Sequence, residues 1–361
     1  MSLKIKHLNS DASFLLTLEP TSRLPPTPGP FDRKFTILLD PWISGPSKIW
    51  HPKFSISTHT VPACIESLAE LPEPDLVVIS QDKSDHCHRE TLTQLPASGG
   101  KTIILAEPSA AKTIRSWKYF DPDKIVTLPK WQDSHRSRKS PAVYRIPIHS
   151  PLPFGVMGEV TIAYLQQKPD ITGLHSAIGI TYRPPTNIER FLPMTPPASP
   201  PSSACSIVPN PLRERALSVL FSPHGCSYKT LSPYVSSHLV AEAALPLTAL
   251  LHSFDTITNS WFLGGKICRG FPGGLEIAQN LCARVWISAH DGDKVLKGYA
   301  TAKLVVTKYD KEEVESIVSP MSVGFPNRKS TEVVVLQPGD EKCLTQDMMS
   351  LTTRSADEIE I

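Results

Sequence analysis

Residues 76–88, LVVISQDKSDHCH, constrain the fold more than any other part of the chain. An apolar run of strand length stops at Ser80 and is followed at once by polar and ionisable side chains. A short apolar run of this kind predicts a strand that is buried on both faces. Carboxylates and imidazoles placed directly after such a strand are potential metal ligands, so the segment is either a metal site or a solvated loop.

Short apolar runs separated by polar loops recur along the chain. Strands are predicted at residues 3–8, 13–20, 35–42, 76–80, 101–107, 124–129, 158–167, 176–184, 216–225, 247–255, 283–293 and 331–339. Helical spacing predicts helices at 61–71, near 88–95, at 109–117 and at 273–282. The first three strands predict a meander, and helices lie between several later strands. This order favours an αββα sandwich over a doubly wound sheet.

Composition limits the setting and the partners. Lys+Arg 37 against Asp+Glu 35 gives a net charge of +2, which predicts neither a nucleic-acid partner nor an anionic membrane partner. The seven cysteines are scattered without a CxxC pair, which favours a reducing compartment. The first residues lack the apolar core of a signal peptide, and no run reaches the length of a membrane span. We therefore expect a cytoplasmic protein, of an oligomeric state that the sequence does not define.

Proline, serine and alanine dominate one segment, at about 184–211. Such sequence buries too little apolar surface to hold a fixed shape, which predicts a disordered insertion. We expect residues 1–308 to form one domain around it. Residues 309–361 are expected to form a C-terminal extension with one strand and a polar, partly disordered tail.

The segment after Ser80 resembles the motif of the metallo-β-lactamase superfamily, in which a strand ends in Ser or Thr and continues His-x-His-x-Asp-His. Residues 80–86, SQDKSDH, keep the frame, the aspartate and the last histidine. KIKHLNSDASFLL and FTILLDPWISG are similar to the first strands of the lactonase-like branch, which includes ascorbate-phosphate lactonase. GGLEIAQNLCARVWISAHDGD resembles the helix and strand that precede the final histidine ligand, here His290. The resemblance covers roughly residues 1 to 305 and implies a metallo-β-lactamase-like fold, with two mixed β-sheets flanked by helices.

The same resemblance implies that the first metal site of the family is lost. Gln81 and Lys83 stand at the positions of the two leading histidines, and Gln167 or Lys168 stands near the position of the third. An amide is a poor zinc ligand, and a protonated lysine is not a ligand at all.

The second metal site is partly retained. The resemblance implies that Asp85, His86 and His290 are ligands, while the position of the bridging carboxylate is occupied by Pro223 or His224. If His224 completes the set, one zinc or another divalent metal could be held with an open position for water. Such a centre would hydrolyse a small ester, lactone or phosphoester.

Other interpretations of these residues stay open. The missing histidines favour a degenerate, non-catalytic or weakly active protein, a pseudoenzyme that binds a ligand or partner. Asp85 could instead cap a helix that begins near His88. Lys83 could take the place of the lost cation, pairing with Asp85 and with Asp82 or Asp291, and act with Asp85 as a catalytic group. A nucleophilic role for the Cys87 thiol is the weakest alternative.

Overall fold

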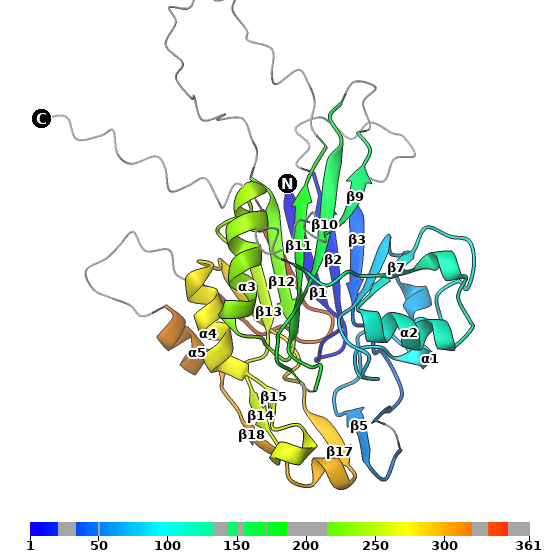
Figure 1. Ribbon diagram of the computed structural model, residues 1–361, viewed down its shortest axis with the longest axis vertical. Helices are drawn as coiled ribbons and strands as arrows, with labels where there is room; N and C mark the ends of the chain where they lie inside the picture. Colours follow the sequence, from blue (N-terminus) through cyan, green and yellow to red (C-terminus); the bar gives the residue numbers. More distant parts are fainter. Residues whose placement is uncertain are drawn as a thin grey trace, which may run out of the picture.

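A computed structural model describes residues 1–20, 34–49, 51–132, 143–150, 155–170, 172–185, 215–319 and 331–345 (Figure 1). The predicted insertion at about 184–211 lies outside the described residues from residue 186 onward. The tail after residue 345 also lies outside them.

The first sheet has seven strands in the order β20-β1-β2-β3-β6-β7-β8. Its strands are β1 (Ser2–His7), β2 (Phe14–Glu19), β3 (Phe35–Leu39), β6 (Leu76–Ile79), β7 (Ile103–Ala106), β8 (Ile125–Thr127) and β20 (Glu341–Thr345). The strands β1, β2 and β3 form the predicted antiparallel meander, and β6, β7 and β8 continue parallel to β3. Residues in β1 and β2 alternate between buried and half-buried, whereas β6 is buried at every position because it lies in the middle of the sheet.

The second sheet also has seven strands, in the order β19-β16-β13-β12-β11-β10-β9. They are β9 (Tyr144–Ile148), β10 (Gly158–Gln166), β11 (Ser176–Arg183), β12 (Leu217–Ser222), β13 (Ala249–His252), β16 (Val285–Ser288) and β19 (Glu332–Val334). The strands β12, β13, β16 and β19 are mutually parallel, so their carboxyl ends meet at one edge of the molecule.

Helices cover the outer face of each sheet (Figure 1). They are α1 (Arg89–Leu92) and α2 (Pro108–Ser116) on the first sheet, and α3 (Tyr228–Tyr234), the π-helical turn η4 (Val235–Leu239), α4 (Gly270–Asn280) and α5 (Lys311–Val318) on the second. A continuous apolar core that includes Phe14 and Phe221 fills the space between the sheets. The structure is therefore the predicted αββα sandwich of metallo-β-lactamase-like architecture. Among the described residues, no helix has the length and apolar character needed to cross a membrane.

Two small sheets lie at one end of the sandwich, at the bottom of Figure 1. One joins β4 (Ser47–Ile49), β5 (Ser55–His59) and β17 (Lys294–Lys297), and the other joins β14 (Thr256–Thr258), β15 (Lys266–Cys268) and β18 (Val305–Thr307). Single turns connect the remaining elements: η1 (Leu68–Glu70), η2 (Pro122–Lys124), η5 (Trp261–Leu263) and η6 (Tyr299–Thr301).

The helix predicted at residues 61–71 is wrong, because only the turn η1 forms there. Backbone groups that a helix would use are bonded elsewhere. The N–H of Cys64 donates to Leu8 O, and the N–H groups of Glu66 and Ser67 donate to the Glu70 carboxylate. Helical spacing of apolar side chains was therefore a misleading signal in this segment.

The segment after residue 308 adds an element to each sheet. β19 extends the second sheet beside β16, as the sequence predicted a strand there. β20 extends the first sheet beside β1, and the sequence did not predict it.

Candidate metal centre

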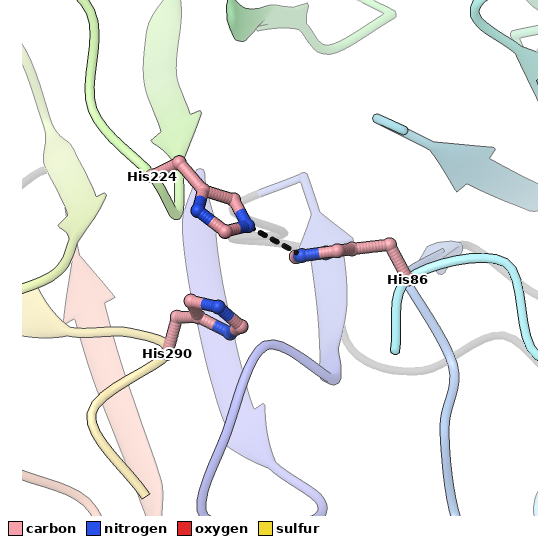
Figure 2. A group of neighbouring side chains, drawn as sticks. All are labelled: His86, His224 and His290. Carbon is pink, nitrogen blue, oxygen red and sulfur yellow. Dashed lines mark hydrogen bonds between the residues drawn. The ribbon is translucent and has the colours of Figure 1, made fainter. Parts of the chain in front are cut away.

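Three histidines from distant parts of the chain converge at the carboxyl ends of the sheet strands. His86 lies in the loop after β6, His224 follows β12, and His290 follows β16 (Figure 2). All three side chains are buried, and each offers a ring nitrogen within 4.8 Å of the others. The Nε2 atoms of His86 and His224 are 3.0 Å apart. The sequence singled out all three residues.

Two of these histidines are each oriented from behind by a buried carboxylate of their own. His86 Nδ1 lies 2.8 Å from Asp40 Oδ2, and His290 Nδ1 lies 2.8 Å from Asp11 Oδ1. Asp40 is fixed in turn by the backbone N–H and the hydroxyl of Ser80, the residue that ends the strand. A histidine that donates Nδ1–H to a carboxylate presents the lone pair of Nε2 on the opposite side, as metal-ligating histidines do.

The third histidine is oriented by a main-chain oxygen. His224 Nδ1 lies 3.1 Å from the carbonyl oxygen of Ile267 in β15, and the Cys268 sulfur lies 3.3 Å from the same nitrogen. The carbonyl can only accept a hydrogen bond, so the Nδ1–H tautomer is favoured here as well. The family resemblance left either Pro223 or His224 at the position of the bridging carboxylate, and it is the side chain of His224 that joins the cluster.

The backbone around the histidines is strained. Ser10, Asp40 and His290 have φ values of 57°, 38° and 72°, in the left-handed region that side-chain-bearing residues seldom adopt. Each such residue costs on the order of 1 kcal/mol and persists only where the surrounding structure enforces it. These are three of the six described residues other than glycine with positive φ, and strain of this kind is often found at functional sites.

The donor geometry fits a metal ion. With Nδ1–H donated to Asp40 by His86 and to Ile267 O by His224, the two Nε2 lone pairs face each other at 3.0 Å. Two lone pairs at this distance repel unless a cation lies between them. Ligands of tetrahedral zinc at about 2.05 Å are about 3.3 Å apart, which is close to the observed spacing.

A proton can fill the same role in the absence of metal. Burial opposes charge on His86, but Asp85 and Asp40 outweigh this effect and raise the pKa of His86. Burial, together with the nearby His290 and His86, holds the pKa of His224 well below its usual range. A protonated His86 can thus donate to neutral His224, and metal binding would displace this proton.

Asp85 lies beside the three histidines but not within their group. Its Oδ2 is 4.0 Å from His86 Nε2, and its Oδ1 is buried without a hydrogen-bond partner among the described residues. Burial would raise the pKa of Asp85, yet the positive charges of His86, His290 and Lys294 lower it. The alternative that Asp85 caps a helix is wrong. The N-cap residue of α1 is His88, and no described side chain accepts a capping hydrogen bond at this helix start.

Lys83 lies in a different environment from the one predicted for a substitute cation. Its ammonium pairs with the adjacent Asp82 at 2.5 Å and is about a third exposed, at 31%. No pairing with Asp85 is present among the described residues. Asp291, the other predicted partner, instead accepts hydrogen bonds from the N–H groups of Phe254 and Asp255.

Lys294, which the sequence did not single out, supplies the positive charge near the histidines. Its Nζ lies 2.9 Å from Asp11 Oδ1 and 3.5 Å from His290 Nδ1. Burial would lower the pKa of Lys294, but Asp11 and Asp85 raise it. Lys294 is the first residue of β17, directly after the loop that carries His290.

The glutamines predicted to replace ligands of the first metal site have hydrogen-bond partners in the scaffold. Gln81 Nε2 donates to Leu174 O, and Gln167 Oε1 accepts from Ser227 N–H. The thiol of Cys87 is buried, and burial raises its pKa well above the usual value, which argues against a thiolate nucleophile.

His175 was also missed by the sequence. Its Nδ1 lies 2.9 Å from Gly225 O, and its Nε2 lies 3.0 Å from Lys266 O. It therefore joins the loop that carries His224 to β15. Its place in the loop beyond Gln166, past the end of the predicted strand, gave no sign of this role.

The fold and the three histidines define a metallo-β-lactamase-like protein whose histidine cluster could hold a metal ion. Solved structures of similar fold include an isothiocyanate hydrolase from Delia radicum gut bacteria, with a TM-score of 0.50 and 13% identity over 94% of this chain and 98% of that chain.

Two further matches are a metallo hydrolase from Ignicoccus hospitalis and the metallo-β-lactamase-fold protein YhfI from Bacillus subtilis. The first has a TM-score of 0.47 and 11% identity over 96% of this chain and 99% of that chain. The second has a TM-score of 0.43 and 10% identity over 94% and 99%. No family model and no curated protein sequence matches the chain.

Proposed function

We propose that this protein is a hydrolase that uses one divalent metal, held by His86, His224 and His290. The observation that carries the proposal is the convergence of three buried imidazoles, each oriented by an oxygen acceptor behind it. Three neutral nitrogen donors suit zinc, and three protein ligands leave a coordination position for water.

When bound, such a metal polarises the substrate and lowers the pKa of water. The chain supplies the surrounding groups. Asp40 and Asp11 hold their histidines in the tautomer that frees Nε2. The carboxylate of Asp85, kept ionised beside His86, can accept a proton at its unpartnered oxygen. Lys294 balances the negative charge of Asp11.

We expect the substrates to be small esters, lactones or phosphoesters. Lactones are included because the sequence resembles the lactonase-like branch. An isothiocyanate belongs in the same panel, because a structure of similar fold is an isothiocyanate hydrolase. All of these carry an electrophilic centre that an activated water can attack.

A second candidate is a metal-binding protein without catalysis. It is supported by the hydrogen bonds of Gln81 and Gln167, whose side chains bond to the backbone at Leu174 and Ser227.

Elemental analysis and hydrolysis of the substrate panel test both candidates. We expect about one metal per chain after purification without chelators. The double variant His86→Ala/His290→Ala should lose the metal, and its hydrolysis should fall at least about 100-fold. The matched control is His238→Ala, a buried histidine that bonds to Thr161 on the second sheet, outside the cluster.

Wild-type protein free of metal would sink both candidates. Metal bound by wild type and lost in the double variant, without hydrolysis of any member of the panel, would leave only the second candidate.

A further inference from the structure

Large apolar side chains are exposed on the small sheets and turns at one end of the sandwich. Trp261 is 87% exposed, Tyr299 63% and Val305 61%. We call the set to which they belong the exposed apolar surface; it consists of Trp261, Phe262, Val295, Leu296, Tyr299 and Val305. Isolated exposed apolar residues are ordinary, whereas a group of this size marks a surface that contacts something else.

These residues lie on elements that are bonded to one another. β14 pairs with β18, which carries Val305. The turns η5 and η6 are connected because Asn259 Nδ2 donates to Ala300 O at 2.8 Å. η5 carries Trp261, and η6 carries Tyr299. Figure 1 shows β14, β15, β17 and β18 together at one end of the molecule.

The same elements are attached directly to the metal centre. Ile267 O in β15 is the acceptor behind His224, and β17 begins with Lys294, which contacts Asp11 and His290. The elements that carry the exposed apolar surface therefore also supply groups that orient the three histidines.

Positive charge predominates on the elements that carry this surface. Residues 256–268 and 294–308 contain five lysines, of which Lys294 is largely buried, and no aspartate or glutamate, although the exposed Asp293 lies directly before β17. Lys266, Lys297 and Lys303 are exposed and have no ion pair among the described residues. Lys308 pairs with Asp293, and acidic residues resume at Asp310. The near-zero net charge of the whole chain conceals this local excess of positive charge.

We propose that the exposed apolar surface docks on an anionic lipid bilayer. Trp and Tyr rings are favoured at the level of the lipid headgroups, and lysines beside them are attracted to anionic lipid. A second copy of the chain fits less well. A twofold interface would place these lysines opposite their own counterparts, and like charges repel. The expectation of no membrane partner rested on the net charge and on the absence of a run long enough to span a membrane, neither of which reports this local pattern.

Flotation of the full-length protein with vesicles tests this proposal. We expect binding to phosphatidylcholine vesicles that contain phosphatidylserine, weaker binding to phosphatidylcholine alone, and release at high salt. Lys297→Ala/Lys303→Ala should weaken binding to the anionic vesicles roughly 10- to 30-fold. Trp261→Ala/Phe262→Ala should weaken it by at least roughly tenfold.

The matched control is Val156→Ala/Met157→Ala, which removes two apolar side chains of 50% and 49% exposure just before β10, at the far end of that strand from the centre. This variant should bind vesicles like wild type. His86→Ala/His290→Ala should also bind like wild type, so that vesicle binding is measured independently of metal and hydrolysis.

Three results would overturn the proposal. These are no flotation of wild type with anionic vesicles, equal flotation of the Trp261→Ala/Phe262→Ala variant, or a wild-type dimer in sedimentation that this variant abolishes. The dimer would assign the surface to a second copy of the chain.

Discussion

Asp11 Oδ1 lies 2.8 Å from His290 Nδ1 and 2.9 Å from Lys294 Nζ, so one buried oxygen joins the loop after β1 to the loop after β16. An anion with no exposed surface is stable only when such partners surround it. The contact orients a candidate metal ligand and also contributes to the stability of the fold.

We expect Asp11→Asn to destabilise the protein by about 3–5 kcal/mol, because it leaves the buried Lys294 with a weaker partner. Urea unfolding at neutral pH measures this loss. The control is Asp293→Asn, which removes an exposed pair with Lys308 and should cost less than about 1 kcal/mol. Equal effects of the two substitutions would contradict a buried ion pair.

Acid should weaken the wild-type protein through the same residue. Burial would raise the pKa of Asp11, but His290 and Lys294 hold it well below the usual value. Stability from this carboxylate is therefore present above the pKa of an unfolded aspartate, about 3.9, and is lost as pH falls below that value. Unfolding measured between about pH 3 and pH 7 should show a shallower acid loss in Asp11→Asn than in wild type. Parallel curves for the two proteins would show that Asp11 does not contribute to the loss of stability in acid.

The two lysines near the centre should behave differently. Lys294→Met leaves Asp11 without its ammonium partner and should cost about 3–5 kcal/mol in the free energy of unfolding. Lys83→Met removes only the partly exposed pair with Asp82 and should cost less than about 1 kcal/mol. Denaturant unfolding of both variants gives the comparison. A larger effect at Lys83 would restore it as the cation of the site.

Asp40 should control metal affinity without binding metal itself. Asp40→Asn keeps the size of the side chain but weakens the acceptor for His86 Nδ1–H, so the affinity should fall about 10- to 100-fold. Competition with a chromophoric chelator measures it. Asp75→Asn, which changes a carboxylate bonded to Thr36 away from the centre, is the control and should keep wild-type affinity. Unchanged affinity in Asp40→Asn would show that the metal does not use His86.

Metal binding should displace the Nε2 proton of His86 wherever that ring is protonated, because burial opposes the charge but Asp85 and Asp40 raise the pKa of His86 above its usual value. Affinity should consequently fall as pH decreases through that pKa. Calorimetry in buffers of different ionisation enthalpy counts the protons. Proton release that does not increase as pH decreases would mean that His86 does not carry the displaced proton.

The sequence predicted much of the fold because its strands are short and strongly apolar. The run at residues 76–80 became β6, and the alternating run at 3–8 became β1, both where expected. Residues 61–71 were mispredicted because hydrogen bonds to Leu8 and Glu70 replaced the helix. The spacing of apolar side chains carries no information about acceptors such as the carbonyl oxygen of Leu8 or the side chain of Glu70.

The candidate site was predictable only where a motif pointed to it. His86 and His290 were found through the resemblance, and His224 was one of two choices. Asp11 and Lys294 were missed because each looks like an ordinary loop or strand residue until the fold brings them together. Asp40 lies in the segment FTILLDPWISG that carries part of the family resemblance. Its hydrogen bond to His86, however, depends on the parallel pairing of β3 and β6.

The pairing of β20 with β1 has a consequence for how the protein is made. His7, at the end of β1, bonds through its ring to Leu336 O, and its backbone is bonded to Gly339 and Asp340 just before β20. His7 Nε2 lies 3.1 Å from Asp11 O on its other side. The loop that carries Asp11 is synthesised more than three hundred residues before Leu336, which supports it through the ring of His7. The ligand-orienting carboxylate at Asp11 therefore gains this support only after the segment near Leu336 has been made.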